Sequence, residues 1–259
     1  MSLPAGSVVV TGASSGLGAA LARRWAEPGR RLALTGRDPA RLAAVVAACR
    51  AGGAEVVARA VDVADAEAMA DFLAEVEAFG PVGTVVANAG VSYGERPGGT
   101  METAEETRRQ IAANAIGVVN TIAPLIPGMR ARRAGRIAII ASLAARIGLA
   151  SAPGYAASKA AAERYGEALR ARLAPEGVAV TVVSAGFFDS AMERRFRGAK
   201  PFRWSLERAA DRIGRGIERG ERSVAFPAPL VIGLAVLPLL PKGAADAIAR
   251  GFRFTVEPP

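Results

Sequence analysis

The chain has 259 residues and a formal net charge of +9, and 51% of its residues are apolar. It is long enough to bury a large α/β core. Most of its cations are arginines, which suit phosphates and carboxylates, so nucleic acid, an anionic membrane surface and a phosphorylated cofactor are all candidate partners. Aromatic residues make up only 5%, which argues against a base-stacking nucleic-acid surface. With no histidine and one cysteine, Cys49, we expect neither a disulfide framework nor a zinc site.

The first third of the chain alternates predicted strands with predicted helices. Short β-branched or apolar runs at 7–11, 31–35, 54–63 and 82–90 are typical of buried strands. Amphipathic stretches at 16–27, 38–53 and 65–80 separate them. Such alternation with short connections predicts a doubly wound parallel sheet with right-handed crossovers.

The remainder continues the same pattern. Thr103 and Glu106 have the spacing of a capping box, which predicts a long helix from there to about 131. Strands are predicted at 135–142, 177–186 and 222–227, helices at 153–174 and 205–220, and a basic loop at 194–200. We expect one domain, in which 1–226 binds the cofactor and holds the catalytic site and 227–259 is an apolar extension.

A glycine cluster, Thr11 to Gly18, lies between the first strand and the first helix. Gly12 permits a tight turn, Gly16 lets the backbone approach a pyrophosphate, and Gly18 lets the helix pack against the strand. The helix N-terminus offers amides and a positive dipole end to phosphate. We therefore expect a dinucleotide site here; a glycine-rich turn without a ligand is the alternative.

The segment 142–159 contains Ser142, Tyr155 and Lys159. If Pro153 opens a helix, the tyrosine and the lysine lie one turn apart on one face. A nearby ammonium lowers the pKa of a phenol, which suits proton transfer to or from an alcohol oxygen. Taken alone, the pair also fits an ordinary solvated helix surface.

The spacing TGxxxGxG at 11–18 resembles that of the short-chain dehydrogenase/reductase family, and three further motifs extend the resemblance. Asn88-Ala89-Gly90 looks like the family's NAG motif, and Asp62-Val63 matches its adenine contact. Asn114, Ser142, Tyr155 and Lys159 match its catalytic tetrad in order. The resemblance covers about 5–226 and implies a Rossmann-type, three-layer α/β/α domain with a seven-stranded parallel sheet.

The resemblance also implies an NAD(P)-dependent oxidoreductase acting on CH–OH/C=O. Tyr155 is then the general acid/base, Ser142 holds the substrate oxygen, and Lys159 lowers the tyrosine pKa and binds the nicotinamide ribose. Asn114 holds a water that links the lysine to solvent. Cofactor contacts are expected from Gly12, Ser14, Ser15, Gly16, Leu17, Gly18, Arg37, Asp62, Val63, Asn88, Ala89, Gly90, Tyr155, Lys159, Gly186, Phe187 and Ser190.

Two positions refine the expected cofactor contacts. Where the family usually has Pro-Gly and, a few residues on, a threonine, this chain has Ala185-Gly186, and Ser190 can supply the hydroxyl of the missing threonine. No carboxylate ends the second strand, whereas Arg37 suits a 2′-phosphate, so we expect NADP(H) rather than NAD(H). The alternative is that Arg37 is a solvated charge.

The apolar segment 224–241 is interrupted by four prolines. Three alternatives are open for this segment. It covers the substrate pocket and subunit interface in the first, inserts peripherally into a membrane interface in the second, and spans the membrane in the third. The first two favour a hydrophobic carbonyl or alcohol substrate, near Ser92, Tyr93, Ala144, Phe187, Phe188 and Met192.

The resemblance implies a homodimer or homotetramer, and we expect a cytoplasmic protein that is membrane-associated if 224–241 contacts a bilayer. A regulator that binds NADP without turnover, disfavoured by the complete tetrad, is the main competing function. A nucleic-acid binder rests on net charge alone, and we expect no nucleic-acid partner.

Overall fold

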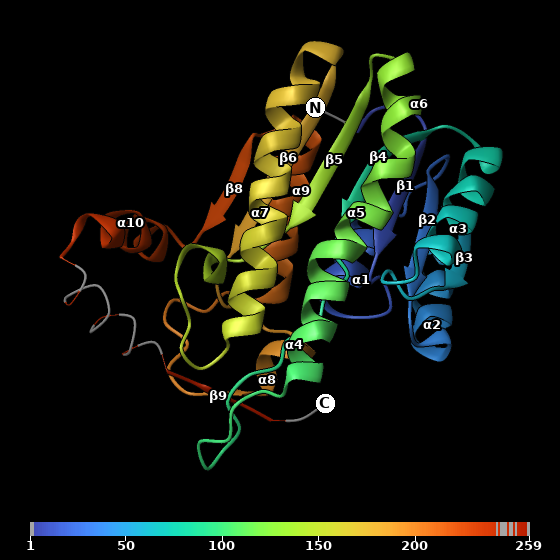
Figure 1. Ribbon diagram of the computed structural model, residues 1–259. Helices are drawn as coiled ribbons and strands as arrows, with labels where there is room; N and C mark the ends of the chain where they lie inside the picture. Colours follow the sequence, from blue (N-terminus) through green and yellow to red (C-terminus); the bar gives the residue numbers. More distant parts are fainter. Residues whose placement is uncertain (1–2, 242, 244–247, 249–250, 252, 258–259) are drawn as a thin grey trace.

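A parallel sheet of seven strands forms the centre of the molecule (Figure 1), a computed structural model that describes residues 3–241, 243, 248, 251 and 253–257. The strand order is β3-β2-β1-β4-β5-β6-β8. The strands are β1 (Ser7–Thr11), β2 (Arg31–Gly36), β3 (Glu55–Ala60), β4 (Val82–Ala87), β5 (Gly135–Ile140), β6 (Val178–Ala185) and β8 (Ser223–Phe226). The order reverses between β1 and β4, and such a switch point opens a crevice at the carboxyl ends of the strands.

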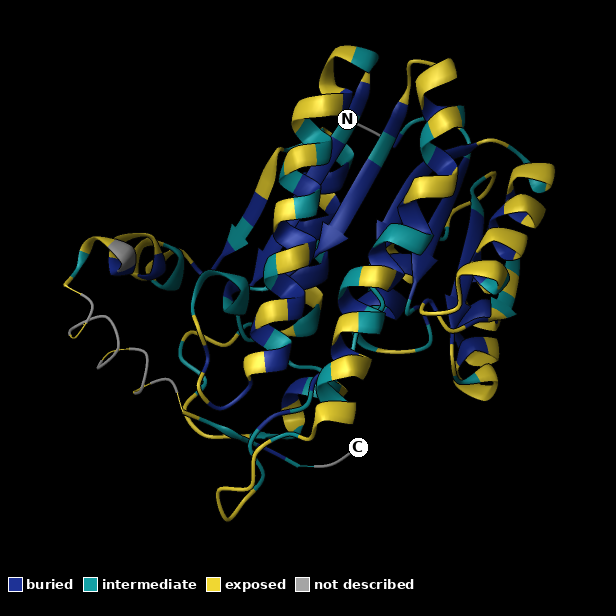
Figure 2. Ribbon diagram, in the orientation of Figure 1, coloured by how far each residue is buried: buried dark blue, intermediate teal, exposed yellow. Residues whose placement is uncertain are grey.

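Helices cover both faces of the sheet, which confirms the expected three layers (Figure 1). On one face α1 packs against α2 and α9; on the other, a long segmented helix packs between α3 and α7. The bounds are α1 (Gly16–Arg24), α2 (Pro39–Ala51), α3 (Ala66–Phe79), α7 (Pro153–Leu173) and α9 (Leu206–Arg219). Val8, Val9 and Val10 are fully buried, because a sheet covered on both faces exposes neither side of a strand (Figure 2).

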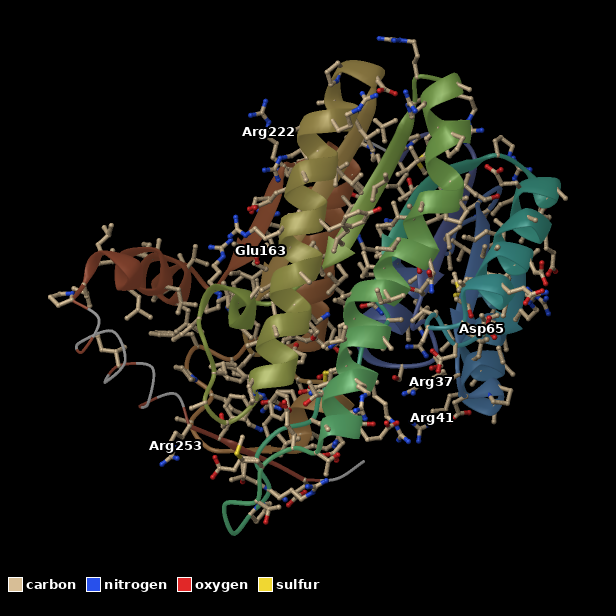
Figure 3. The ribbon with its side chains drawn as sticks, viewed as in Figure 1. Arg37, Arg41, Asp65, Glu163, Arg222 and Arg253 are labelled. Carbon is tan, nitrogen blue, oxygen red and sulfur yellow. The ribbon has the colours of Figure 1, made fainter. Side chains whose placement is uncertain are left out.

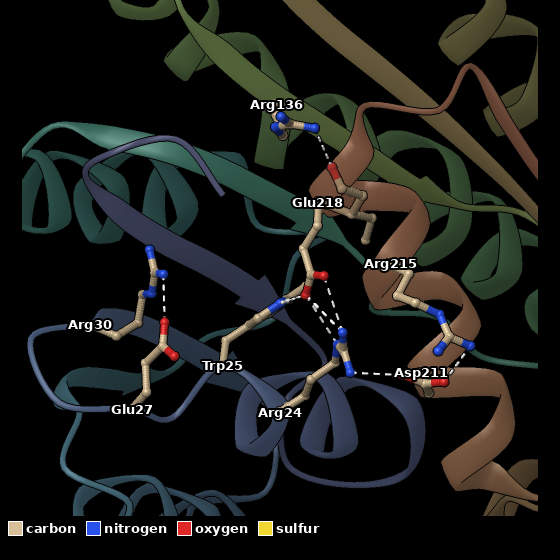
Figure 4. A network of polar contacts seen from close by, with 9 residues as sticks. Arg24, Trp25, Glu27, Arg30, Arg136, Asp211, Arg215 and Glu218 are labelled. Atoms are coloured by element: carbon tan, nitrogen blue, oxygen red, sulfur yellow. Dashed lines mark hydrogen bonds and ion pairs between the residues drawn. The ribbon is translucent and has the colours of Figure 1, made fainter. Parts of the chain in front are cut away.

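A network of ion pairs ties α1 to α9 on the first face (Figure 4). Arg24 contacts Asp211 at 2.9 Å and Glu218 at 3.0 Å, and the Trp25 indole donates to Glu218 at 2.9 Å. Because α1 starts directly after the glycine cluster, these contacts help fix the direction in which its N-terminus points.

The predicted long helix is present but is not uniform. It consists of α4 (Ala104–Ile111), a π-helical turn (Ala112–Ile116), α5 (Gly117–Ile122), a 3₁₀ turn (Ala123–Leu125) and α6 (Ile126–Ala131). Its capping box is confirmed: the Thr103 amide donates to Glu106 Oε2, and the Glu106 amide donates to Thr103 Oγ1. By length and composition 104–131 passes as a membrane span, a test that core helices also pass, and here it packs in the helix layer.

The basic stretch 194–200 differs from the expected loop. It contains the end of α8 (Ala191–Arg194) and a short strand, β7 (Phe196–Arg197), which pairs antiparallel with β9 (Thr255–Val256). The pairing joins positions about sixty residues apart, so no local sequence pattern predicts it. After β8 the chain forms α10 (Ala228–Val236) and a 3₁₀ turn (Leu237–Leu239), while Lys242, 244–247, 249–250 and 252 lie outside the described residues.

Candidate active site

A cleft of about 500 Å³ opens at the carboxyl ends of the strands. Its walls come from the loops after β1, β2, β3, β4, β5 and β6, from α7 and from the C-terminal segment. Most residues expected at the site line it: Gly12, Ser14, Ser15, Gly16, Leu17, Arg37, Asp62, Val63, Asn88, Ala89, Gly90, Ser142, Ala144, Tyr155, Lys159, Gly186, Phe187, Phe188, Ser190 and Met192.

The glycine turn leaves the N-terminus of α1 open. Gly12 and Gly16 have φ values of 65° and 52°, a left-handed conformation that L side chains rarely adopt. A Cβ on Gly18 would lie 2.3 Å from the Gly12 carbonyl oxygen, so this glycine is required for close packing. The Ser15 side chain makes no capping hydrogen bond to the start of α1, and the first turn of α1 contains no acidic residue. The backbone amides at this helix N-terminus are therefore open to a pyrophosphate, so the turn fits a dinucleotide cofactor.

Asn88 and Thr11 connect the loop after β4 to the glycine turn. The Asn88 side-chain amide donates to the Thr11 carbonyl at 2.9 Å, and the Thr11 hydroxyl accepts from the amides of Asn88 and Ala89, each at 3.1 Å. The NAG motif therefore fixes the floor of the cleft.

Tyr155 and Lys159 lie in the first two turns of α7 and both line the cleft. Lys159 is 6% exposed, and its Nζ donates to the Ile140 carbonyl at 2.7 Å. Burial lowers the pKa of Lys159 to about 8. Burial also raises the pKa of Tyr155, and a hydrogen bond with Ser142 lowers it in part. This direction is opposite to the expected lowering, because desolvation outweighs other effects and the ammonium is bonded to a backbone carbonyl.

Ser142 lies two residues after the end of β5, directly before a 3₁₀ turn (Leu143–Arg146). Its Oγ accepts from the Ala144 amide at 3.1 Å and lies 3.5 Å from the Ala185 carbonyl. The hydroxyl is thus held at the cleft beside the tyrosine.

Asn114 is fully buried in the π-helical turn and does not line the cleft. Its Oδ1 accepts from the Val91 amide at 2.8 Å, and its Nδ2 donates to the Val91 carbonyl and the Ser158 hydroxyl, each at 2.9 Å. A Cβ built on Gly90 would lie 2.8 Å from Asn114 Oδ1 and 3.4 Å from Lys159 Nζ, which places the amide close behind the lysine.

The chain departs from the usual family motif at Ala185, at the end of β6, and contacts with β8 and Pro227 hold the turn that follows. The Gly186 amide donates to the Phe226 carbonyl at 2.8 Å, and a Cβ on Gly186 would meet Pro227 at 2.8 Å. The Ser190 hydroxyl caps α8 by accepting from the Glu193 amide at 3.0 Å. Neighbouring strands therefore secure the turn without a proline.

A second arginine stands beside Arg37 at the rim of the cleft. Arg41 lies one turn into α2, where its Nε contacts Asp38 at 3.0 Å, and Figure 3 shows the two arginines next to each other. Asp38 also caps α2 by accepting from the Arg41 amide. Arg41 could have been found from the sequence, because it follows Arg37 by four residues, one on each side of the predicted start of a helix.

Three other expected residues lie away from the cleft. Gly18 is buried against the glycine turn, and Tyr93 lines a separate small pocket. Ser92 is buried, and its hydroxyl has no hydrogen-bond partner among the described residues. The Tyr93 amide donates to Gln110, which holds this loop against α4. The far wall of the cleft is apolar, and two of its residues, Leu230 and Leu234, belong to the segment 224–241 that one alternative placed over the substrate pocket. Sequence reasoning missed the rest of this wall, formed by Leu143, Ile147, Leu149, Phe196, Pro201 and Phe254.

A family model described as short chain dehydrogenase matches residues 7–200. This chain belongs to the short-chain dehydrogenase/reductase family. Its fold, motifs and relatives make it an oxidoreductase that uses a nicotinamide cofactor on CH–OH/C=O groups.

Relatives extend over nearly the whole chain. It is 35% identical to an uncharacterized oxidoreductase of Myxococcus xanthus over 95% of this chain and 97% of that protein. It is 36% identical to a putative ketoacyl reductase of the granaticin polyketide synthase of Streptomyces violaceoruber, over 82% and 79%.

Solved structures agree on the fold. A short-chain dehydrogenase from Sphingobium yanoikuyae in complex with NADPH superposes with a TM-score of 0.78 at 25% identity, covering 96% of both chains. One from Burkholderia phymatum in complex with NAD gives a TM-score of 0.83 at 22% identity, covering 92% of this chain and 95% of that one.

Proposed function

We propose that this dehydrogenase interconverts a hydrophobic ketone and its secondary alcohol with NADP(H), and that Tyr155 is the general acid/base. The observation that carries the proposal is the convergence of Ser142, Tyr155 and Lys159 on one cleft that also contains the uncapped glycine turn. Acid–base groups and a phosphate cradle in one cleft fit hydride transfer at a carbonyl.

The side chains divide the work at the carbonyl oxygen. The bound cofactor would supply or accept the hydride at carbon. In reduction the Tyr155 hydroxyl donates its proton to the oxygen, while the Ser142 hydroxyl donates a hydrogen bond to the same atom. Burial raises the pKa of Tyr155, so its phenol is protonated at neutral pH, which is the form that can donate a proton to the carbonyl oxygen. The charged Lys159 stabilises the phenolate left behind and binds the ribose.

Tyr155→Phe tests the acid/base assignment, because it preserves the ring and removes the transferable proton. We expect the turnover of NADPH with a ketone to fall by at least about a hundredfold. Tyr165→Phe, on the same helix but outside the cleft, is the matched control and should retain activity. A near-normal turnover number in Tyr155→Phe would refute the role.

Measurements on the wild-type chain distinguish an enzyme from a regulator that binds NADPH without turnover. If the wild-type chain binds NADPH, as seen by fluorescence titration, but oxidises it with none of a panel of ketones, the competing function of a sensor without turnover would be favoured.

The preference for NADP(H) rests on Arg37, which directly follows β2, and on Arg41 in the first turn of α2. Both arginines line the cleft, and β2 itself ends on Gly36 and not on a carboxylate. Guanidinium groups form paired hydrogen bonds with phosphate, so both arginines suit the adenosine 2′-phosphate. Arg37→Asp should lower the ratio of kcat/KM for NADPH over NADH by at least about tenfold. Arg50→Asp, at the opposite end of α2, controls for net charge. An unchanged ratio would leave the cofactor preference unexplained by this site.

An apolar substrate is supported by the far wall of the cleft, whose lining is almost entirely aliphatic and aromatic. The ketoacyl reductase similarity is compatible with it, since such a substrate carries a ketone on an acyl chain. Methyl ketones of increasing chain length should therefore be reduced with increasing kcat/KM until the wall is filled.

Contact with a membrane surface is proposed for the outer side of α10 and of the 3₁₀ turn that follows it. Leu234 and Leu237 pack inward against Leu143, whereas Ile232 and Leu239 are 64% and 81% exposed. Co-sedimentation with anionic vesicles should be weakened in Ile232→Glu and unchanged in Glu207→Gln, a variant on α9. Absence of vesicle binding by the wild-type chain would exclude this contact.

An oligomer is proposed on the face formed by the long helix and α7. Ile111 and Ile116 are exposed there at 42% and 50%, and burial of these side chains in a dimer would stabilise it. Sedimentation of the wild-type chain and of Ile116→Asp tests this: a monomeric wild type contradicts the proposal.

A further inference from the structure

We infer that residues 253–257 form a strap that closes the substrate end of the cleft, and that Phe254 in this strap sets which substrate lengths the enzyme accepts. The inference rests on the proposed function for the identity of the substrate as a ketone. The strap itself is defined by contacts that are independent of that identity.

The first set of contacts joins the strap to β7. Phe196 pairs with Val256 and Arg197 with Thr255 in an antiparallel ribbon. The Glu257 amide donates to the Arg195 carbonyl at 2.9 Å, and Arg195 Nε donates back to the Glu257 carbonyl at 2.8 Å. The strap thus holds the part of the chain between β6 and α9, which forms one side of the cleft.

The second set joins the strap to the loop after β4. The Val256 amide donates to the Glu95 carbonyl at 2.7 Å, and the Glu95 amide donates to the Ser151 carbonyl at 2.6 Å. Ser151 lies just before α7, the helix of Tyr155. Three segments that are distant in the sequence and surround the substrate end are therefore connected through one short strand.

Two glycines make room for this strand. A Cβ on Gly94 would lie 2.6 Å from the Ser151 carbonyl oxygen and 2.9 Å from the Val256 side chain. A Cβ on Gly198 would lie 3.1 Å from both the Arg253 carbonyl oxygen and Phe254 Cβ, and Gly198 has a φ of 139°. Val256 is only 2% exposed, so the strap is packed against the domain rather than laid over it.

Phe254 is the strap residue that forms a wall of the cleft. Its ring stacks on Phe196 with centroids 5.1 Å apart, and both residues line the cleft together with Leu230 and Leu234 of α10. Arg253, next to it, lies on the opposite side of the molecule from Arg37 and Arg41 in Figure 3. The aromatic pair therefore limits the end of the cleft that is far from the proposed 2′-phosphate site, where the apolar part of a substrate would lie.

Phe254→Ala tests this assignment with NADPH and methyl ketones that carry propyl, hexyl and decyl chains. Removing the ring enlarges the apolar end, and one methylene group more or less in such a pocket changes kcat/KM by about ten- to two-hundredfold. We expect the decyl-to-propyl ratio of kcat/KM to change by at least about tenfold, mainly through KM, with the NADPH dissociation constant unchanged. Phe202→Ala, the same substitution at an exposed ring between β7 and α9 that does not line the cleft, should leave the ratio unaltered.

An unaltered chain-length ratio in Phe254→Ala would overturn the assignment of specificity. If the wild-type chain reduces none of the ketones, the proposed function fails, and the strap is then tested by amide hydrogen exchange on the full-length chain. Val256→Asp places a carboxylate in the buried strap, and β9 lies outside the seven-stranded sheet. Faster exchange of 93–97 and 194–198, with the strands of the main sheet unchanged, supports the strap; unchanged exchange in those two segments overturns it.

Discussion

Glu163 is a buried carboxylate in the second turn after Tyr155, and it connects three parts of the active site. It is 2% exposed and accepts from Arg146 Nε and from the Ser184 hydroxyl, each at 3.2 Å. Arg146 ends the 3₁₀ turn that begins after Ser142, and Arg146 also donates to Ser184 at 3.3 Å. The ion pair therefore holds the turn that carries Ser142 against α7 and β6.

Glu163→Gln should weaken this connection while keeping the shape of the side chain. A neutral amide holds a guanidinium less strongly than a carboxylate does, and loss of a charged hydrogen bond costs about 1.5–3 kcal/mol of the free energy of unfolding. We expect kcat to fall severalfold with the NADPH dissociation constant unchanged, because the contact supports Ser142 and not the glycine turn. Glu167→Gln, one turn further on and paired with Arg164 near the surface, is the control. Equal kinetics in both variants would mean that Glu163 has a purely structural role.

At the scale of elements, the N-terminus of α7 is capped from another part of the chain. Ala152 precedes the helix and supplies no side-chain cap. Instead Glu102, from the loop before α4, accepts from the Gly154 amide at 2.6 Å, and Gln110 Nε2 donates to the same carboxylate at 3.0 Å. A carboxylate at this end of a helix satisfies a free amide and interacts favourably with the helix dipole.

Glu102→Ala should therefore lower the free energy of unfolding by about 1–2 kcal/mol, the usual cost of losing a helix cap. Chemical denaturation measures the difference. Glu105→Ala, whose exposed carboxylate pairs only with Arg108 and Arg109 among the described residues, should change stability by less than about 0.5 kcal/mol. If the two variants are equally stable, the contact at α7 contributes nothing beyond a surface charge.

Local signals in the sequence predicted the main helices and strands, but they did not predict the contacts between distant parts of the chain. The capping box of Thr103 and Glu106 lies within four residues and was readable, and so were the alternating strands and helices. The cap from Glu102 to Gly154 and the pairing of β7 with β9 join positions fifty or more residues apart, so they appear only when the chain is folded. The motif residues of the cleft were found because the family spacing identifies them, whereas its apolar far wall has no such spacing.

At the scale of the whole molecule, the parallel sheet brings the polar residues of the site together at the carboxyl ends of its strands, where Lys159 is buried. Seven strands run in the same direction, so the loops after β1, β4, β5 and β6 meet above the carboxyl ends. Lys159 reaches this edge from α7 through the packed helix layer and remains 6% exposed. Burial disfavours its charged form, which makes the lysine a cost to stability that depends on pH.

That cost predicts how the stability of the free protein changes with pH. The pKa of Lys159 is about 8 in the folded chain and 10.5 in the unfolded chain, so between these values the unfolded state binds more protons. Stability should therefore rise with pH from about 8 to 10.5, relative to a Lys159→Met variant, by at most about 3 kcal/mol. Subtracting the variant removes the opposing contribution of Cys49, whose pKa burial raises and which titrates in both proteins. Urea unfolding of both proteins at pH values across this window gives the difference. A difference that is independent of pH would show that Lys159 is charged in the folded chain throughout, held so by its hydrogen bond to the Ile140 carbonyl.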